Sequence, residues 1–394
     1  MRILHLTNKP IFPLLDGGCV AMNQVSKLLH AQGHSVKNLS IATTKHPFDL
    51  SKFPEDFIKK NNPEAVKLDT EIRISKASIS LLKGTSYNLE RFKSVQFSQR
   101  LAALLNEEKY EIVVCESVYL LPYYSIIRTN SSAKIIVRTH NVEYRIWERL
   151  TENARFPKSN YLSSLAKRLK REEIALLQQT DAILSISEKD TEVFKTLKIQ
   201  TPIFTLPVFI DTVTQFVNAR SNQFHHIGSM NWQPNLEAVE LLLKSIFPKI
   251  KNQLPQAELH LAGSFFPENI KSDSSKGIFV HGYVDNAFDF IQNHGIQLIP
   301  LKSGSGVRIK ILESMAIGTP IVTTKMGIEG IELDSEQALF IAKDEQEFVD
   351  CAVELSKNDE LRAKMGANAR QFITNNYNFD KINIQFSEFL EHVS

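Results

Sequence analysis

The sequence predicts an α/β protein with two doubly wound parallel sheets, and three observations support this fold class. Short apolar runs alternate with amphipathic stretches along the whole 394-residue chain, a pattern typical of β-α-β units. The pattern restarts near residue 224, and a chain of this length is expected to form about two domains. Glycines follow predicted strands in both halves, at Gly17-Gly18 and at Gly304–Gly306. Since such sheets bind ligands beyond the carboxyl ends of their strands, we expect two Rossmann-like domains that face each other across a cleft.

The first half, residues 1–207, predicts a parallel sheet with helices between its strands. The apolar runs that we assign to strands are Met1–Thr7, Ser35–Ile41, Ile112–Glu116, Ile135–His140, Ala182–Ser187 and Ile203–Pro207. A helical stripe covers Val20–His30, and a long basic helix is expected over Leu162–Gln178. Residues 42–100 are polar, lysine-rich and less regular, which indicates an elaborated region of loops and helices.

The second half, residues 208–376, repeats the pattern after a linker at Val208–Asn222. Its predicted strands are Phe224–Met230, Glu258–Gly263, Ile278–Gly282, Ile296–Leu301 and Ile321–Thr324, and its predicted helices are Leu236–Phe247, Asp344–Ser356 and Asp359–Tyr377. Asp285 is the expected cap of the helix between the third and fourth of these strands. Residues 377–394 form an amphipathic terminal helix that we expect to pack back toward the first domain.

Charge is unevenly distributed along the chain. Residues 1–205 carry 30 Lys and Arg against 21 Asp and Glu, whereas residues 206–394 carry 16 against 23. The first half would therefore be drawn to an anionic partner or a membrane surface, and four cations of its long basic helix favour the same partners. These are Lys167, Arg168, Lys170 and Arg171. The excess is modest and is not interleaved with an aromatic platform, which argues against nucleic-acid binding.

Targeting and metal-binding patterns are not visible in the sequence. The chain opens directly with a strand, and no apolar run approaches the ~20 residues that a membrane span needs. We therefore expect a cytoplasmic protein whose basic half can contact the inner face of the membrane. The three cysteines lie far apart without metal-ligand spacing, so we assign no metal ligands.

The segment Leu301–Thr324 predicts the end of a strand, a glycine-bearing loop, a helix that opens at Gly306, and another strand. The helix would direct the positive end of its dipole at a ligand, and Arg308 and Lys310 add two cations. Glu313 lies seven residues after Gly306, on the same helical face. Cations for phosphates and a carboxylate for ribose hydroxyls suit a nucleoside diphosphate. An ordinary β-loop-α unit with a basic edge is the alternative interpretation.

Several motifs along nearly the whole chain resemble those of one enzyme family. They are Pro13–Gly18, Gly33–Val36, Thr139–Glu143, Ile227–Met230 with Trp232 and Pro234-Asn235, and Gly304–Thr324. Their order and spacing are similar to those of retaining glycosyltransferases of the GT-B fold, of the group 1, family 4 kind. The most specific block is Lys310–Ala316 with Gly318-Thr319-Pro320.

The resemblance implies roles for residues of both halves. The helix near Gly306 would hold the donor diphosphate, Glu313 would bind its ribose, and Lys310 and Arg308 would stabilise the leaving group. Relatives often have a glutamate where this chain has Ser305, so Ser305 would contact the donor sugar without supplying charge. The donor would also meet Gly228 after the first strand of the second half. In the first half, Gly17 and Gly18 would approach the same diphosphate, and His140 would contact the reacting end of the sugar.

The function implied is retaining, hexosyltransferase-type transfer from a UDP- or GDP-sugar to a saccharide or lipid-linked acceptor, as in surface-polysaccharide or glycoconjugate biosynthesis. No cofactor or metal is expected, since no Asp-x-Asp pair occurs in the chain. A nucleotide-sugar epimerase that uses His140 and Glu143 is one alternative. A non-catalytic nucleotide-sugar-binding scaffold is another, and Ser305 favours it. A nicotinamide dehydrogenase is disfavoured because the first strand is not followed by G-x-G-x-x-G.

Overall fold

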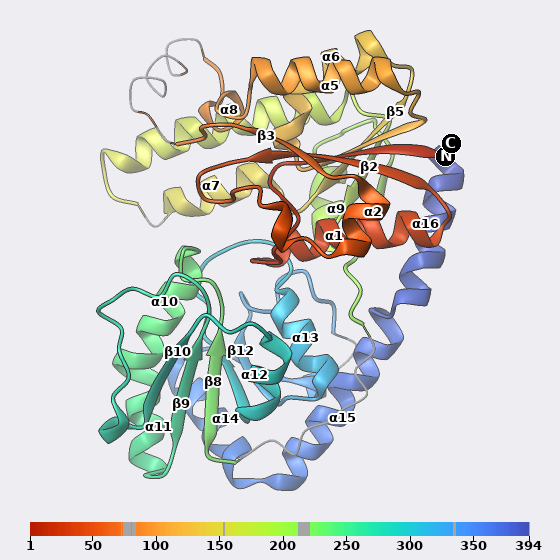
Figure 1. The fold of residues 1–394 in the computed structure, drawn as a ribbon. Helices are drawn as coiled ribbons and strands as arrows, with labels where there is room; N and C mark the ends of the chain where they lie inside the picture. Colours follow the sequence, from red (N-terminus) through yellow and green to blue (C-terminus); the bar gives the residue numbers. More distant parts are fainter. Residues whose placement is uncertain are drawn as a thin grey trace. The chain divides into compact units, whose positions relative to one another are not determined.

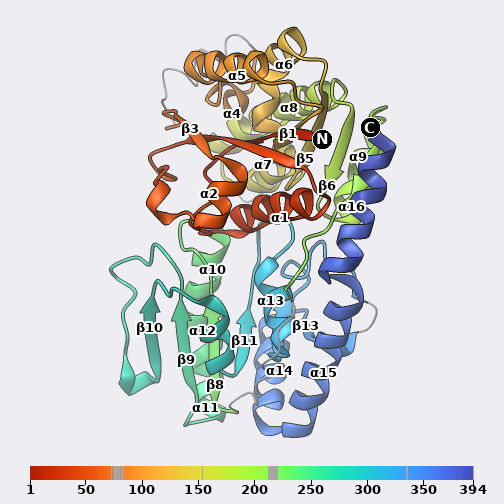
Figure 2. The same cartoon turned by 45° about the vertical axis from the view of Figure 1, so that its right-hand side comes forward.

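The computed structural model describes residues 1–71, 73, 80, 84–152, 154–211, 221–333 and 336–393 (Figures 1 and 2). The chain separates into two compact units. Unit 1 comprises residues 1–208 together with 382–394, and unit 2 comprises residues 209–381. The expected linker at Val208–Asn222 falls largely outside the described residues. Within the described ranges, none of the helices combines the length and the apolar character that crossing a bilayer requires.

Unit 1 is built on a parallel sheet that has seven strands in the described residues, in the order β3-β2-β1-β4-β5-β6-β7. The strands are β1 (Arg2–Thr7), β2 (Ser35–Ala42), β3 (Glu64–Lys67), β4 (Ile112–Glu116), β5 (Lys134–Thr139), β6 (Ala182–Ser185) and β7 (Ile203–Thr205). Their apolar side chains are buried on both faces, as the continuous apolar runs in the sequence predict. The strand order reverses between β1 and β4, and this reversal marks the position where a doubly wound sheet binds ligands.

Helices cover both faces of the unit 1 sheet. Figure 1 shows α5 (Val95–Glu107) and α6 (Tyr124–Asn130) on one face and α1 (Gly17–Ala31) on the other. The remaining α-helices described in this unit are α2 (Glu55–Asn61), α4 (Tyr87–Glu90), α7 (Glu143–Glu152), α8 (Lys158–Leu177) and α9 (Glu188–Thr196). The terminal helix α16 (Phe379–Val393) contributes its residues from Ile382 onward to unit 1, where Phe389 packs edge-on against Phe204, with the ring centroids 5.0 Å apart.

Unit 2 repeats the doubly wound arrangement, with six parallel strands in the described residues in the order β10-β9-β8-β11-β12-β13. The strands are β8 (Gln223–Ile227), β9 (Glu258–Ala262), β10 (Ile278–Gly282), β11 (Ile296–Ile299), β12 (Ile321–Thr324) and β13 (Phe340–Ala342). Its α-helices are α10 (Gln233–Leu241), α11 (Phe247–Gln253), α12 (Ala287–Asn293), α13 (Ile309–Ile317), α14 (Glu345–Lys357) and α15 (Asp359–Asn376). The strand order reverses between β8 and β11.

The two parallel-sheet units confirm the predicted fold class, with local corrections. Asn286, not Asp285, caps α12: its side chain accepts hydrogen bonds from the backbone N–H groups of Phe288 and Asp289. The predicted helix from Leu236 is longer than expected, because α10 continues through a π-helical turn at Leu242–Ile246 into α11. The region 42–100 contains more regular structure than its composition indicates, including β3 at the sheet edge and α5 over its face.

Candidate functional site

The loop between β11 and α13 lies at the strand reversal of unit 2, beside the loop that follows β8. Gly304 and Gly306 have φ angles of 113° and 83°, in the region that favours glycine. A Cβ atom on Gly304 would lie 2.8 Å from the Trp232 ring, so the loop backbone packs directly on this side chain. Trp232 follows β8 and caps α10. The two loops at the reversal are therefore held together by a close backbone-to-ring contact.

The α13 helix begins later than the sequence predicts. Its first residue is Ile309 and its N-cap is Arg308, so the predicted start at Gly306 is wrong by three residues. The positive φ angle of Gly306 is incompatible with a right-handed helix and explains the delay. Lys310 is consequently the second helical residue, at the positive end of the helix dipole. Its Nζ lies 3.7 Å from Glu313 Oε2, one turn further along.

Arg308 is directed into the loop. Its guanidinium lies 5.0 Å from the centroid of the Trp232 ring, and its Nη1 donates to the carbonyl oxygens of Ser305, at 2.6 Å, and Gly306. Arg308 is almost fully buried, whereas the Lys310 side chain is 40% exposed. The structure therefore places Arg308 as a brace of the loop that contains Ser305 and leaves Lys310 as the accessible cation of the pair.

Glu313 presents an acceptor atom. Its side chain is 14% exposed, and its Oε2 is buried without a hydrogen-bond partner among the described residues. A buried carboxylate oxygen that accepts no hydrogen bond is costly unless a ligand or solvent supplies the donor. This oxygen can accept a hydrogen bond from a hydroxyl group of a ligand.

Gly228, at the end of β8, is constrained by its neighbours. A Cβ atom there would lie 2.5 Å from the side-chain nitrogen of Asn235, which itself donates to the Ser229 carbonyl at 3.0 Å. A Cβ atom on Gly263 would lie only 1.7 Å from the Gly228 carbonyl oxygen, so Gly263 is also held to glycine. Glycine at 228 thus lets the chain pass under the first turn of α10 at the strand reversal.

In unit 1 the structure builds a polar cluster around Glu116, the last residue of β4. His140 Nε2 lies 2.6 Å from Glu116 Oε2, and His5 Nε2 lies 2.9 Å from Glu116 Oε1. Arg138 Nη1 is 4.0 Å from the same carboxylate. These residues come from the carboxyl halves of β1, β4 and β5, around the strand reversal. His140 is 14% exposed and the other side chains are buried, so His140 is the member of the cluster that reaches solvent.

The electrostatics of this cluster favour the carboxylate form of Glu116. Burial alone would raise the pKa of Glu116, but the hydrogen bonds with His140 and His5 and the charge of Arg138 hold it well below its usual range. The ionised carboxylate fixes the orientation of the His140 ring, in the way that a carboxylate orients an imidazole in many enzymes.

The glycine pair of unit 1 forms the start of a helix, three residues before the helical stripe that the sequence predicts from Val20. The α1 helix begins at Gly17, because the N-cap Asp16 accepts a hydrogen bond from the Cys19 N–H at 3.0 Å. Lys9 Nζ lies 2.6 and 2.7 Å from the two Asp16 oxygens and 3.0 Å from where a Cβ atom of Gly18 would be. Burial would raise the pKa of Asp16, but the charge and hydrogen bonds of Lys9 bring it to about 2. A lysine, the capping carboxylate and the helix terminus thus lie together.

Glu143 and Glu173 form a buried carboxyl pair in unit 1, in a cluster separate from that of Glu116. Glu143, the first residue of α7, accepts a hydrogen bond from the Tyr119 hydroxyl at 2.8 Å, and burial raises its pKa to about 6. The Glu173 side chain accepts hydrogen bonds from the backbone N–H groups of Glu143 and Tyr144, at 3.1 and 3.0 Å. Burial, together with the charge of Glu143, raises the pKa of Glu173 to about 8. His140 is hydrogen-bonded to Glu116, whereas Glu143 is hydrogen-bonded to Tyr119. The two residues that the epimerase alternative would use as a pair therefore belong to different clusters.

This pair makes a testable prediction about pH. Because the folded-state pKa of Glu173 lies above the ordinary value, the folded state binds more protons between about pH 4.5 and pH 8. Its contribution to stability is present below that range and is lost as the pH rises through it. We expect the free energy of unfolding of the wild type, relative to Glu173→Gln, to fall by more than about 1 kcal/mol between pH 5 and pH 8 in urea titrations. A pH-independent difference would contradict the assignment.

Four residues at these sites were not predicted from the sequence. Glu116 and His5 lie inside apolar strand runs, and their partners are more than 20 residues away in the chain. Lys9 had a local signal, since it is a cation between the first strand and the glycine pair. Glu173 is one of two adjacent carboxylates in a long basic helix and gives no sequence signal of its own.

Comparison with known proteins gives a consistent result. Residues 221–358 match the family model described as "Glycosyl transferases group 1". The chain is 25% identical over 405 residues to the "Uncharacterized 44.6 kDa protein in cps region" of Klebsiella pneumoniae, and the match covers 97% of each protein. The segment of the chain that matches this family model contains both the loop before α13 and Glu313.

Solved structures establish the fold. A sucrose-phosphate synthase from Thermosynechococcus elongatus is 13% identical with a TM-score of 0.71, and the match covers 100% of this chain and 99% of that one. HepE of Anabaena, in complex with UDP-glucose, is 12% identical with a TM-score of 0.65, and the match covers 100% of both chains. The chain therefore has the GT-B fold, and a segment of its second unit matches the model of the group 1 glycosyl transferases.

Proposed function

We propose that this protein is a retaining glycosyltransferase that moves a sugar from a UDP- or GDP-sugar to a saccharide or lipid-linked acceptor without a metal. The observation that carries the proposal is the start of α13, where an exposed lysine at the helix terminus lies 3.7 Å from a carboxylate oxygen without a hydrogen-bond partner among the described residues. The lysine at the helix terminus suits a diphosphate, and the carboxylate oxygen suits a ribose hydroxyl. HepE, which shares the fold, is known in complex with UDP-glucose.

The chemistry needs stabilisation of a leaving group. When the bond between the anomeric carbon and the phosphate oxygen breaks, negative charge develops on the departing diphosphate. Lys310 and the N–H groups at the start of α13 are preorganised to meet that charge. In a front-face reaction the acceptor oxygen bonds to the anomeric carbon and its proton passes to the departing phosphate oxygen, so no separate base is needed. The sugar keeps its anomeric configuration.

Unit 1 supplies complementary groups in this proposal. Its helix terminus at Gly17 and Gly18, with Lys9 beside it, is a second anion-binding arrangement for the donor diphosphate. His140, oriented by Glu116 and open to solvent, would contact the donor sugar. Gly228 and Ser305 would lie near the sugar in unit 2, while Arg308 would shape the loop there and add to the positive potential.

The acceptor is proposed from charge. The excess of Lys and Arg in residues 1–205 favours an anionic, lipid-linked saccharide, as in surface-polysaccharide or glycoconjugate assembly at the inner face of the membrane. The relative in Klebsiella pneumoniae is named for its place in the cps region. Within the basic helix α8, Arg171 donates to the Gly84 carbonyl at 2.6 Å and Lys170 lies 4.6 Å from the centroid of the Tyr144 ring, so these cations also stabilise the fold. Lys167 is exposed and suited to membrane contact.

Donor binding tests this function. Thermal unfolding would be followed with nucleoside diphosphates and their sugars, without added metal, for the wild type, Glu313→Ala and a control variant. A ligand at 100 times its Kd should stabilise the wild type by about 2.7 kcal/mol. We expect selective stabilisation by UDP or GDP compounds, lost in Glu313→Ala and kept in Glu354→Ala, which removes an exposed carboxylate of α14.

The other outcomes decide between the alternatives. No stabilisation by any nucleotide would contradict the proposal. Donor binding without transfer to any of a broad set of acceptors would favour the scaffold interpretation, whereas conversion of the donor sugar without an acceptor would favour an epimerase.

A further inference from the structure

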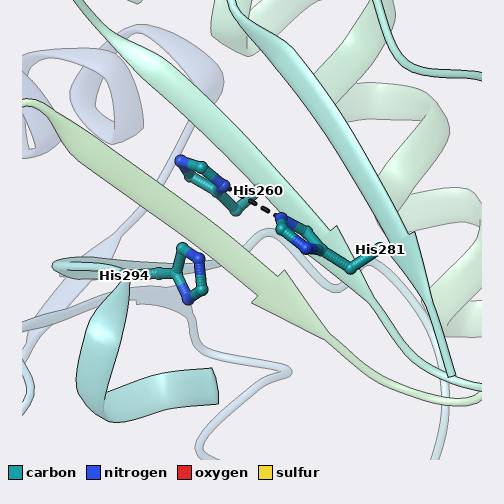
Figure 3. A group of neighbouring side chains, drawn as sticks. All are labelled: His260, His281 and His294. Carbon is teal, nitrogen blue, oxygen red and sulfur yellow. Dashed lines mark hydrogen bonds between the residues drawn. The ribbon is translucent and has the colours of Figure 1, made fainter. Parts of the chain in front are cut away.

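Three histidines of unit 2 gather at one place (Figure 3). His260 lies on β9, His281 on β10, and His294 directly after α12. One ring nitrogen from each can be chosen so that all three lie within 4.8 Å of one another. The closest pair, His260 Nδ1 and His281 Nε2, is joined by a hydrogen bond of 3.0 Å, and a bound ion would displace its proton. Three imidazoles from three different elements thus converge on one point.

Hydrogen bonds to the opposite ring nitrogens orient two of these rings. His294 Nδ1 lies 2.6 Å from the Phe290 carbonyl, which can only accept, so Nδ1 carries the proton and Nε2 carries a lone pair. His260 Nε2 lies 3.4 Å from Glu258 Oε2, which favours the proton on Nε2 and the lone pair on Nδ1. Carbonyl and carboxylate partners of this kind hold metal-binding histidines in proteins.

The surroundings are apolar on one side and open on the other. Phe279 stacks on His260 with ring centroids 5.1 Å apart, and Phe290 lies 4.3 Å from His294 and 5.3 Å from His281. His260 is buried and His281 is exposed, so an ion could enter from solvent past His281.

We propose that His260, His281 and His294 bind one divalent transition-metal ion, with Zn²⁺ as the best fit and a water molecule as the fourth ligand. Nitrogen ligands select zinc and its neighbours over magnesium and calcium. Zinc–nitrogen bonds of about 2.0–2.1 Å place tetrahedral ligand atoms about 3.3 Å apart. The three ring nitrogens lie within 4.8 Å of one another, so they would close to that spacing when the ion binds. The ion would fasten α12 to β9 and to the edge strand β10.

This site is separate from the loop that carries the proposed function. His294 precedes β11 and the glycine loop follows it, and the four residues of β11 span about 13 Å. The metal therefore serves the structure of unit 2, and sugar transfer is expected to need no metal even when this site is filled.

Metal titration of the full chain without a histidine tag tests the proposal. Isothermal titration with ZnCl₂ should give one ion per chain, and Co²⁺ should give the absorption bands of a tetrahedral complex. His281→Gln should weaken Zn²⁺ binding at least 10-fold and abolish the Co²⁺ bands without changing the melting temperature of the metal-free protein, since His281 is exposed. Glu258→Gln, which alters the carboxylate beside His260, should weaken binding about 10- to 100-fold.

The control is His34→Gln, a change in unit 1 that should leave both titrations unaltered. Absence of zinc binding to the wild type would overturn the proposal. So would wild-type affinity and stoichiometry in both His281→Gln and His294→Gln. Failure of the sugar-transfer proposal would show instead in the nucleotide panel, so the two results can be told apart.

Discussion

Lys310→Ala is expected to lower kcat for sugar transfer by a factor of about 30 to 1,000. This corresponds to the roughly 2–4 kcal/mol that a preorganised donor contributes when charge develops on a leaving group. The structure places Lys310 in the first turn of α13 with its ammonium accessible, while Arg308 is occupied with the carbonyl oxygens of its own loop. Steady-state kinetics with the nucleotide sugar identified by the binding panel would measure the loss of kcat. This prediction rests on the proposed function.

The pattern of kinetic constants separates this role from simple donor binding. An interaction made mainly in the transition state lowers kcat and kcat/KM together, whereas one made equally in the ground state raises KM alone. Lys310→Arg keeps a cation and should retain more activity than Lys310→Ala. Lys244→Ala, which removes an exposed lysine that pairs with Glu240, should behave as the wild type. An unchanged kcat in Lys310→Ala would refute the role.

The fold could be predicted because each strand carries its own signal. Runs such as Ile112–Glu116 and Ile321–Thr324 begin with apolar, β-branched residues and are almost entirely buried, as is typical of parallel strands, and the observed strands have the predicted limits. The same alternation of apolar runs and amphipathic stretches restarts near residue 224, and it predicted the second sheet in the same way. Strand β3, Glu64–Lys67, escaped prediction because an edge strand with charged ends has no continuous apolar run.

The site was predictable only where its residues are neighbours in sequence. Gly304, Gly306, Lys310 and Glu313 lie within ten residues, so their glycine and charge pattern is readable, although the φ angle of Gly306 moved the helix start to Ile309. Two glycines near a helix therefore give its approximate position but not its first residue. The backbone angles, which the sequence does not state, decide it.

Clusters assembled by tertiary contacts give no such pattern. The three histidines of unit 2 are separated by 21 and 13 residues in the chain and follow no metal-binding spacing. They meet because β9 and β10 pair in parallel and α12 packs over the same face. Glu116 is similar, because its partner His5 lies 111 residues away and is set beside it by the pairing of β1 with β4.

Glu116→Gln is expected to destabilise unit 1 by about 3–5 kcal/mol at pH 7, the cost of removing one partner from a buried ionic cluster. The amide cannot balance the charge of Arg138, which is 1% exposed, and it cannot accept from both His5 and His140. Urea unfolding in a Trp232→Phe background would measure the loss, because the remaining tryptophan, Trp147, lies in unit 1. Glu108→Gln, an exposed change on the same unit, should cost less than about 1 kcal/mol.

The pH dependence of that difference identifies its cause. Because the folded-state pKa of Glu116 lies below the ordinary value, its stabilisation is present above about pH 4.5 and is lost as the pH falls toward the folded-state value. The gap between wild type and Glu116→Gln should therefore narrow on acidification, whereas a gap caused by poor packing of the amide would stay constant. A constant gap would show that the carboxylate charge does not stabilise unit 1. A narrowing gap, with a lower kcat in Glu116→Gln at pH 7, would tie the orientation of His140 to the charge of Glu116.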